Sequence, residues 1–372
     1  MTGIVYIDLR KAFDTVNHDI LLQKLPGFGI RNMELNWFKS YLSGRSQAVA
    51  VDGNISDTLP ITVGVPQGSI FGPLLFLLYM NDLPNINESC KINMYADDTA
   101  IHLASKSPAQ LESKINKDLG KVQKYFQQNK LSLNVNKCEF MLVGTAQKLK
   151  QFDSVSIKIN NEPLKKVKCA KYLGMTIDEN LRWGNHIDTL AKKVSQRLGI
   201  LRRMKRIVPQ ITLKTIYNSL ILPQFDYADV VYDSCTETDK DRLQRLQTKA
   251  AQILTGSKPR THRNDMYKEL KWMSLQNRRN SNKSILMYKC QNSLAPAYLT
   301  DIHQRNSDIH GYNTRSANKL RIDRIRTCYY ERSFKVTGAK IWNGLPESVI
   351  SKKSLNTFKN AVKEHFLNGN QF

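Results

Sequence analysis

Two adjacent carboxylates stand in the middle of the segment NMYADDTAI, residues 93–101. Asp97 and Asp98 are flanked by residues that favour β-strands, among them Tyr95 and Thr99. Because aspartate tolerates turn geometry, the pair fits the tip of a β-hairpin with no further role. Two neighbouring carboxylates can also bind a divalent cation, which offsets their mutual repulsion. The segment alone leaves both interpretations open.

A third carboxylate favours the chemical interpretation. Asp8 ends the segment GIVYID, residues 3–8, whose apolar and β-branched residues predict a buried strand. If the hairpin pairs beside this strand in one sheet, three carboxylates meet at one edge and need cations between them. Oxygen ligands favour Mg²⁺ or Mn²⁺ over zinc, and two such ions about 4 Å apart suit an in-line displacement at phosphorus. Asp8, Asp97 and Asp98 are therefore predicted to bind divalent metal ions.

Further elements must hold these acids in place. Asp14 is expected to cap a helix over residues 15–22 by accepting backbone N–H bonds. Ser69 and Pro73 mark the start of a helix whose body, residues 74–80, is apolar on every side and is expected inside the domain. The other predicted elements are helices over residues 33–42, 110–128, 185–206 and 241–254, and a pair of strands over residues 47–51 and 61–63.

The charge of the chain is large and unevenly distributed. The 372 residues are 41% hydrophobic, which predicts a folded protein with a sizeable core, and they carry a formal net charge of +24. The first 100 residues hold 7 Lys and Arg against 10 Asp and Glu, and the remainder holds 49 against 22. Lys and Arg that neutralise phosphates release condensed counterions. The distribution therefore predicts a nucleic acid as the partner of a basic region joined to an acidic one.

Cysteine usage and hydropathy predict the compartment. The six cysteines contain no C-x-x-C pair, so free thiols in a reducing compartment are expected rather than a zinc or redox site. The longest apolar run, residues 70–80, is about half the ~20 residues that a membrane helix needs. No secretory signal opens the sequence. A soluble, intracellular protein with no membrane partner is expected.

Five blocks follow one another along the chain. They are YIDLRKAFD (residues 6–14), GVPQGSIFGPLLF (64–76), YADD (95–98), LSLNVNK (131–137) and KYLG (171–174). These blocks resemble the successive palm blocks of reverse transcriptases, in the form found in non-LTR retrotransposons. The stretch from NTRS (313–316) to WNGLP (342–346) resembles the tail of jockey-like elements. Phe71 stands where the family usually has a smaller aliphatic residue, which is expected to be a tolerated core change.

The resemblance implies an α+β fold of three parts. A right-hand polymerase palm, an antiparallel sheet with packed helices, is expected over residues 1–183. A helical thumb-like region is expected over residues 184–256, and a small basic C-terminal domain over residues 257–372. The boundaries are placed near the sequences RWGN (182–185) and GSKP (256–259).

The resemblance also implies an activity, RNA-directed DNA polymerisation. Asp8 and Asp97 are expected to bind two Mg²⁺ or Mn²⁺ ions, with Asp98 supporting the site. One ion would lower the pKa of the primer 3′-hydroxyl, and the other would hold the triphosphate and the leaving pyrophosphate. The implied partners are an RNA template, a DNA primer and deoxynucleoside triphosphates. A ribonucleoprotein in the nucleus and cytoplasm is expected.

The same blocks imply roles for residues around the acids. The nucleotide-binding set is Leu9, Phe13, Gln67 and Gly68. Phe13 would clash with a 2′-hydroxyl and favour deoxynucleotides, although a core aromatic is the alternative. Gln67 and Gly68 would contact the nascent base pair and the template, with the glycine permitting close backbone approach. Ser69 is consistent with a helix cap alone.

Two further blocks are assigned in the same way. Lys137 resembles the lysine that approaches the triphosphate and protonates pyrophosphate, and a solvated surface lysine is the alternative. Tyr172, Leu173 and Gly174 resemble the hairpin that grips the primer end, although a structural turn would need the same glycine.

Basic residues dominate the chain beyond the palm. An amphipathic helix presents Ile187, Leu190, Val194 and Leu201 on its apolar face. The basic residues on or after this helix are Lys192, Lys193, Arg197, Arg202, Arg203, Lys205 and Arg206. They are predicted to follow the template–primer backbone, and a merely solvated face is the alternative. Near the C-terminus, basic and aromatic residues interleave in a way that suits RNA phosphates and bases: Arg315, Arg321, Arg324, Arg326, Arg332 and Lys335 with Tyr329, Tyr330 and Phe334. Trp342 is expected to anchor a small core.

The sequence departs from the family pattern at its start. Met1 lies seven residues before Asp8, whereas the family places a basic fingers region before this strand. Weak or no activity of this chain alone is therefore expected. A non-enzymatic RNA- or DNA-binding remnant of a decayed or co-opted element is the alternative, and its salt-sensitive binding would survive loss of the three acids.

Overall fold

The chain folds into two compact units. The computed structural model describes residues 1–258, 260–308 and 317–368, and its units are Met1–Leu181 and Arg182–Phe372. The first division lies two residues before the boundary predicted at 183/184. The further division at 256/257 stays a prediction, since the second unit is described as one body. Within the described ranges, no helix is both long enough and apolar enough to span a membrane.

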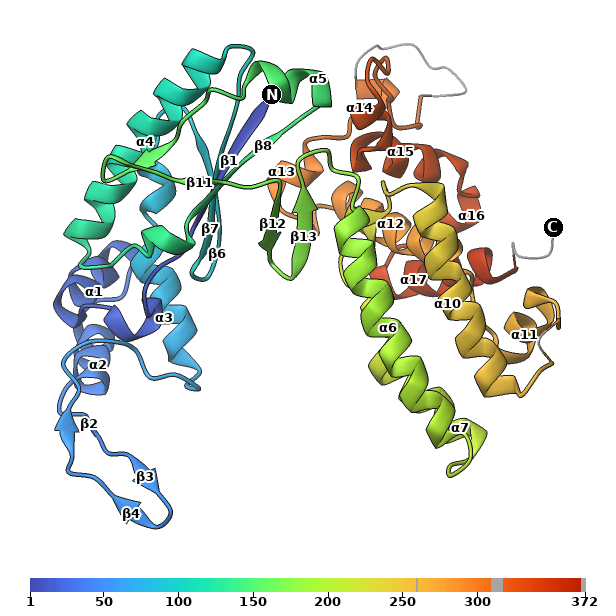
Figure 1. Cartoon of the computed structure of the whole chain (residues 1–372), viewed down its shortest axis with the longest axis horizontal. Helices are drawn as coiled ribbons and strands as arrows, with labels where there is room; N and C mark the ends of the chain where they lie inside the picture. The colour runs from blue at the N-terminus through green and yellow to red at the C-terminus, as the bar shows by residue number, and fades with distance from the viewer. Residues whose placement is uncertain (259, 309–316, 369–372) are drawn as a thin grey trace. The chain divides into compact units, whose positions relative to one another are not determined.

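A five-stranded sheet forms the centre of the first unit (Figure 1). Its strand order is β11 (Lys165–Lys166), β8 (Glu139–Val143), β1 (Thr2–Ile7), β7 (Asp98–Ala104) and β6 (Lys91–Tyr95). The four longer strands pair antiparallel, as predicted, whereas the two-residue β11 pairs parallel with β8. The sheet is therefore mixed. The smaller elements that follow β8 are α5 (Ala146–Gln151) and the hairpin of β9 (Lys158–Ile159) and β10 (Glu162–Pro163).

Alternation of side chains on β1 fixes which face of the sheet is buried. Gly3, Val5 and Ile7 are buried, while the residues between them are partly exposed. Helix α4 (Pro108–Gln128) covers the buried face, and it comes so close that a Cβ atom on Gly3 would lie 2.9 Å from Cδ1 of Ile115. Because strand side chains alternate with a period of two, this packing fixes the register of β1.

Asp118 on α4 anchors the segment that leads into β6. Its fully buried carboxylate accepts backbone hydrogen bonds from Ser89 (3.0 Å) and Cys90 (2.7 Å). Burial raises the pKa of this carboxyl, but the N–H donors of Cys90 and Ser89 outweigh burial and hold the pKa below its ordinary value. Asp118 therefore ties the start of β6, and with it the acidic hairpin, to the helical layer.

Asp118→Ala is expected to lower the free energy of unfolding by about 3 kcal/mol at pH 7, because the buried N–H of Cys90 and the half-buried N–H of Ser89 lose their acceptor. A folded pKa below the unfolded value stabilises the protein above about pH 4, and this stabilisation is lost as the pH falls through the folded pKa. Urea unfolding at pH 7 and pH 3 should therefore show a difference from wild type that shrinks in acid. Asp153→Ala, which removes an exposed carboxylate, is the control. Identical unfolding midpoints for Asp118→Ala and wild type at pH 7 would contradict this role.

The helices that follow β1 correct the expected cap. Helix α1 spans His18–Lys24, and the side chain of Asn17, not Asp14, accepts its capping bond from the backbone N–H of Ile20 (3.0 Å). Asp14 lies instead in a short 3₁₀-helix, Ala12–Thr15, where its carboxylate accepts from Nε2 of Gln67 (2.7 Å). The prediction was wrong because the 3₁₀ turn moves the start of the helix three residues along the chain.

Helices α2 and α3 form where predicted, but one burial prediction was wrong. Helix α2 spans Asn32–Leu42, and α3 spans Phe71–Met80. Leu75, Phe76 and Tyr79 are fully buried, whereas Leu74 and Leu77 are 46% and 50% exposed. Within the described first unit, α3 packs through one face only. An all-apolar helix sequence cannot show which of its faces finds a partner.

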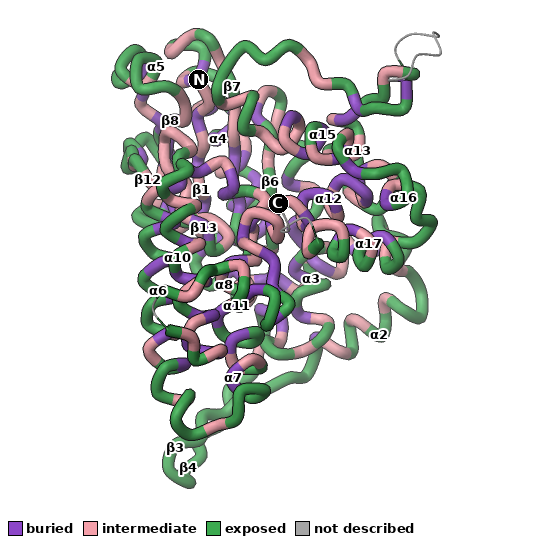
Figure 2. The backbone as a smooth tube through the Cα atoms, turned by 90° about the vertical axis from the view of Figure 1, so that its right-hand side faces the viewer, coloured by how far each residue is buried: buried purple, intermediate pink, exposed green. Residues whose placement is uncertain are grey.

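The segment between α2 and α3 differs from the predicted pair of strands. It forms two short hairpin ladders, in which β2 (Ser46–Gln47) pairs with β5 (Leu59–Pro60) and β3 (Ala50–Val51) pairs with β4 (Asn54–Ile55). Residues 61–63 form no strand and contribute a single bridge between Val63 and Asn17. Figure 2 shows this hairpin as an exposed extension. Among the described residues, all members of these four short strands are exposed, so the hairpin lacks the burial that stabilises longer strands.

The second unit is helical in its described parts (Figure 1). Its helices are α6 (Gly184–Met204), α7 (Gln210–Ile216), a π-helix (Tyr217–Ile221), α8 (Leu222–Asp226), α9 (Asp229–Tyr232), α10 (Glu237–Thr255), α11 (Arg263–Leu270), α12 (Leu275–Gln291), α13 (Ala297–Thr300), α14 (Cys328–Arg332), α15 (Phe334–Gly344), α16 (Glu347–Ile350) and α17 (Leu355–Asn368). Trp342 anchors a small core, as predicted, and its ring stacks on Phe358, which stacks in turn on Tyr288.

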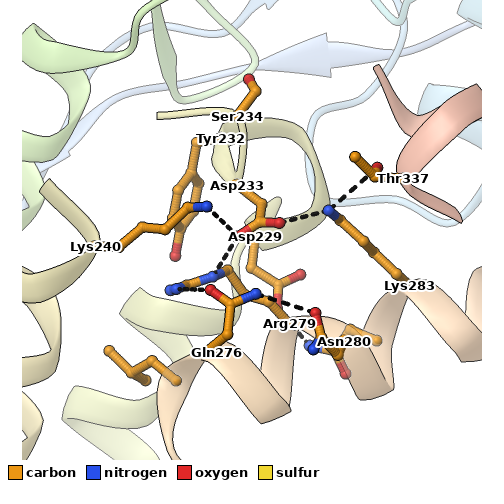
Figure 3. A network of polar contacts seen from close by, with 12 residues as sticks. Asp229, Tyr232, Asp233, Ser234, Lys240, Gln276, Arg279, Asn280, Lys283 and Thr337 are labelled. Carbon is orange, nitrogen blue, oxygen red and sulfur yellow. Dashed lines mark hydrogen bonds and ion pairs between the residues drawn. The ribbon is translucent and has the colours of Figure 1, made fainter. Parts of the chain in front are cut away.

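A buried ion cluster joins several of these helices (Figure 3). Asp233, just after α9, forms ion pairs with Arg279 (2.6 Å) and Lys283 of α12, and the three side chains are at most 7% exposed. Lys240 of α10 lies 3.9 Å from the same carboxylate, and Lys283 also donates to the hydroxyl of Thr337 on α15 (3.3 Å). One carboxylate therefore balances two buried cations at the centre of the unit.

Candidate active site

The three acids meet at one end of the sheet. In the antiparallel register of β1 and β7, Ile7 pairs with Thr99, so Asp8 follows directly opposite Asp98. In the β6–β7 hairpin, Tyr95 pairs with Asp98, which leaves Ala96 and Asp97 as a two-residue turn. The convergence predicted from the sequence, a hairpin tip beside the end of another strand, is confirmed by this register.

Electrostatics show that the three carboxylates interact. The pKa of Asp98 is raised by burial first, and then by the charges of Asp97 and Asp8. The donor set is made of carboxylate oxygens, which suits a hard divalent cation. In the part of the chain that the structure describes, no group of three His, Cys, Asp or Glu side chains is placed so that it could hold a metal ion as it stands. Metal binding therefore requires these side chains to turn toward one another.

Asn134 holds Asp8 in place from a neighbouring segment. Its side-chain amide donates to Oδ2 of Asp8 (2.9 Å), and its backbone N–H donates to the carbonyl oxygen of Asp8 (2.9 Å). Leu9 and Leu133 form a β-bridge beside this pair. Sequence reasoning missed Asn134, although it lies in the block LSLNVNK, because a bond across 126 residues leaves no local signal.

The KYLG hairpin also reaches the acids. Strands β12 (Cys169–Tyr172) and β13 (Met175–Asp178) are joined by Leu173 and Gly174, whose φ values are +46° and +75°. Two positive φ values are typical of a type I′ turn and explain the glycine. The Tyr172 ring lies 5.6 Å from the Tyr6 ring. Burial, and then the charge of Asp98, raise the pKa of Tyr172. The hairpin therefore lies against the sheet face beside Asp98.

Phe13 lies on the edge of the core. Its half-buried ring stacks on Phe76 of α3 at a centroid distance of 4.5 Å. A ring at this position is compatible with a core aromatic and with a steric gate. The contact between Phe13 and Phe76 therefore does not distinguish the two roles. Leu9 has a buried side chain, which leaves only its backbone for contact with a nucleotide.

A tightly packed loop positions the GVPQG block. Gly64 has a φ of +88°, and a Cβ atom there would lie 2.7 Å from the backbone oxygen of Asp14. Backbone bonds from Gly64 to Val16 (2.7 Å) and from Val65 to Phe13 (2.9 Å) hold the loop against the first block. Only glycine fits this position, since both the φ value and the space exclude a side chain.

An open cavity lies along this loop. It has a volume of about 590 Å³, and residues 60–67 line it together with Lys11, His18 and Arg45. Gln67 faces this cavity, and Gly68 follows with a φ of +80° and open space around it. The hydroxyl of Ser69 accepts from the backbone N–H of Gly72 (2.9 Å), as expected of a residue at a helix start. Gln67 and Gly68 are therefore exposed, as template contacts require.

The structure does not bring every predicted residue to the acids. Lys137 is exposed in a short 3₁₀-helix, three residues after Asn134. On α6 the four predicted apolar residues are buried, and Lys192, Lys193, Arg202 and Arg203 are exposed, while Arg197 donates to the carbonyl oxygen of Leu220 (2.6 Å). These basic residues belong to the second unit, so their nucleic-acid role stays a prediction. Arg315 and the NTRS stretch lie outside the described residues.

Comparison with known proteins identifies the class of the first unit. Residues 1–177 match the family described as "Reverse transcriptase (RNA-dependent DNA polymerase)". This part of the chain therefore carries a reverse transcriptase domain.

The related proteins narrow the family to non-LTR retrotransposons. The chain is 30% identical over 278 residues to the RNA-directed DNA polymerase from mobile element jockey of Drosophila melanogaster, covering 72% of this chain and 30% of the relative. It is 27% identical over 281 residues to the probable RNA-directed DNA polymerase from transposon X-element of the same species, with the same coverage. The chain thus spans about 30% of the length of these relatives. A solved telomerase from Candida albicans, in complex with a fragment of telomeric RNA, aligns over 73% of this chain and 51% of its own, with 11% identity and a TM-score of 0.39.

Proposed function

We propose that the chain carries the catalytic palm of a non-LTR retrotransposon reverse transcriptase, which adds deoxynucleotides to a primer 3′-hydroxyl by a two-metal mechanism. The observation that carries the proposal is the register of β1 and β7, which sets Asp8 opposite Asp98 beside the turn that holds Asp97. Membership of residues 1–177 in the reverse transcriptase family supports it. The proposed partners are an RNA template, a DNA primer and deoxynucleoside triphosphates.

In this proposal the acids hold two Mg²⁺ or Mn²⁺ ions. Bound ions supply a lowered pKa at the primer hydroxyl and neutralise charge on the triphosphate and pyrophosphate. Asp8 and Asp97 would hold these ions, and Asp98, at the start of β7, would support them. Asn134 orients Asp8 by holding Oδ2, which leaves its other carboxylate oxygen available. Orientation of a metal ligand by such a hydrogen bond is common in metal sites.

The other residues position the substrates. Phe13 excludes a 2′-hydroxyl, while Gln67 and Gly68 contact the nascent base pair along the open cavity. The KYLG hairpin holds the primer end, and its Tyr172 ring lies against the Tyr6 ring of β1, the strand that leads to Asp8. Lys137 donates a proton to pyrophosphate. The basic side of α6 follows the template–primer, and the protein works as a ribonucleoprotein of the cytoplasm and nucleus.

The test is Mg²⁺- or Mn²⁺-dependent deoxynucleotide addition by residues 1–372 to a DNA primer on an RNA template. The double variant Asp97→Asn/Asp98→Asn is the matched control, because it removes two charges and keeps the side-chain shapes. We expect weak incorporation by the natural sequence, as the sequence predicts for this chain alone, and none by the control. No incorporation by either protein, with tight RNA binding by both, would indicate a binding protein rather than an enzyme.

Asn134→Ala is expected to reduce nucleotide addition by about 10- to 100-fold and to raise the metal concentration needed for half-maximal rate. Asp8 loses its orienting donor, but its charge remains. The control is Asn136→Ala, an exposed asparagine two residues away in the same block. Primer extension across a Mn²⁺ titration checks both effects. Equal behaviour of the two variants would show that the bond to Asp8 is not used.

A further inference from the structure

The second unit contains a basic groove that the proposed function does not use. Two cavities of about 410 Å³ and 350 Å³ share Lys271, Trp272 and Leu367 as lining residues. Both volumes lie within the range of sites that hold small organic groups, about 300–1,000 Å³. We name this feature the α11–α17 groove, after two of the helices that line it.

Lysines from separate helices line the α11–α17 groove. Lys214 of α7, Lys363 of α17 and Lys271, just after α11, line the larger cavity, and Lys268 lines the smaller one. Lys214 uses one donor on the carbonyl oxygen of Leu270 (3.1 Å) and keeps two, while Lys271 and Lys363 take part in no ion pair within the described chain. Among the described residues, no Asp or Glu lines either cavity. The groove is therefore suited to an anion.

The other wall of the groove is apolar and rigid. Trp272 is 9% exposed, and its ring stacks on the fully buried ring of Tyr217 at a centroid distance of 4.1 Å. Leu222, Met273 and Leu367 complete this wall. Arg278 also lines the cavity, but both Oδ atoms of Asp226 hold its guanidinium, so it shapes the wall rather than offering free charge. A ligand that is anionic on one side and flat and apolar on the other matches this pair of walls.

We propose that the α11–α17 groove binds single-stranded nucleic acid, with its phosphates on the lysines and its bases against the Trp272 wall. A phosphodiester strand repeats phosphate and base, which matches two adjoining cavities with the same kind of lining. The unit has the overall charge for this role, since residues 182–372 hold 35 Lys and Arg against 15 Asp and Glu. An acidic peptide would satisfy the lysines but would bring no flat apolar group to the Trp272 wall. None of the basic residues of α6, which the proposed function assigns to the template–primer, lines either cavity.

The test measures binding of fluorescent oligo(rU) and oligo(dT) by anisotropy in EDTA, where polymerisation cannot occur. The groove variant Lys214→Gln/Lys271→Gln/Lys363→Gln removes three charges. The control variant Lys319→Gln/Lys352→Gln/Lys353→Gln removes three exposed lysines elsewhere in the unit. The groove variant is expected to bind the oligonucleotides about tenfold or more weakly. The plot of log association constant against log salt concentration should also become less steep by about 2, as the loss of three phosphate contacts predicts. The control variant is expected to change affinity by less than about threefold.

A second measurement places the ligand in the groove. Oligonucleotide binding should quench tryptophan emission in the natural sequence, and Trp272→Phe should remove that quenching while keeping binding. If the groove variant loses more affinity for oligo(rU) than for oligo(dT), the groove is assigned to RNA. If it loses the same affinity for both oligonucleotides, the groove is assigned to single strands of either sugar. If the groove variant and the control variant lose the same affinity for one oligonucleotide, the proposal is overturned. Displacement of oligo(rU) by polyglutamate as readily as by unlabelled oligo(rU) would overturn it too. Neither result depends on catalysis, so failure here is distinct from failure of the proposed polymerase.

Discussion

Asp8→Asn is expected to lower the rate of deoxynucleotide addition at least about a thousandfold, corresponding to about 4 kcal/mol of transition-state stabilisation. The amide keeps the shape of the side chain and removes the charge that the proposed function assigns to metal binding. Asp8 is only half-buried, and its side chain is held by Asn134 alone among the described contacts. The fold should therefore survive, and circular dichroism should be unchanged.

The three acids are expected to differ in a defined order. Asp97→Asn should match the loss at Asp8, whereas Asp98→Asn should cost about 10- to 100-fold, because Asp98 supports the metal ligands. Primer extension gives the rates, and Mn²⁺ binding measured by electron paramagnetic resonance gives a readout that does not require activity. Asp19→Asn, at an exposed acid of α1, is the control. Unchanged Mn²⁺ binding by Asp8→Asn would contradict the assignment of Asp8 as a metal ligand.

Asp233→Ala is expected to lower the free energy of unfolding by about 3–5 kcal/mol, the largest stability effect expected in the chain. The substitution leaves Arg279 and Lys283 buried without their common counter-ion. An unpaired buried charge costs far more than the intact pair contributes. Urea unfolding followed by tryptophan emission checks this, since Trp183, Trp272 and Trp342 all lie in the second unit.

A second variant tests the mechanism of this loss. Asp233→Ala/Lys283→Met removes one of the two unpaired charges and should recover part of the lost stability. The exposed carboxylate of Asp241, on α10, provides the control as Asp241→Ala, which is expected to change stability by less than about 0.5 kcal/mol. If Asp233→Ala and Asp241→Ala unfold at the same urea concentration, the cluster does not stabilise the unit.

The sequence predicted the placement of the three acids at one end of the sheet because the signals for it are local. An alternating apolar strand ending in Asp8 and a hairpin tip at Asp97 are readable within ten residues each, and the family blocks fixed their order. Helices α2, α4, α6 and α10 form close to their predicted ranges for the same reason, since an apolar stripe at helical spacing is a local pattern.

The predictions that were wrong, and the contacts that were missed, depend on segments that lie far apart in the sequence. Asp14 has the composition of a helix cap, but the 3₁₀ turn around it gives that role to Asn17. The apolar sequence of α3 does not show that Leu77 lacks a partner within its unit. The bond from Asn134 to Asp8 and the ion pairs of Asp233 join residues 126 and about 50 positions apart. Polar pairs of this kind leave no periodic trace in the sequence.

The register of β1 and β7 is set by residues other than the acids that would carry out the chemistry of the site. The carboxylates of the acids repel one another and bury no apolar surface, whereas Val5 and Ile101, which face each other in the same ladder, are fully buried. A slip of one residue would place Asp8 and Asp98 on opposite faces of the sheet. Loss-of-function alleles can therefore arise at apolar positions that never touch a nucleotide, in a protein that still accumulates. In a population of such elements, inactive copies need not carry any change in the YADD block itself.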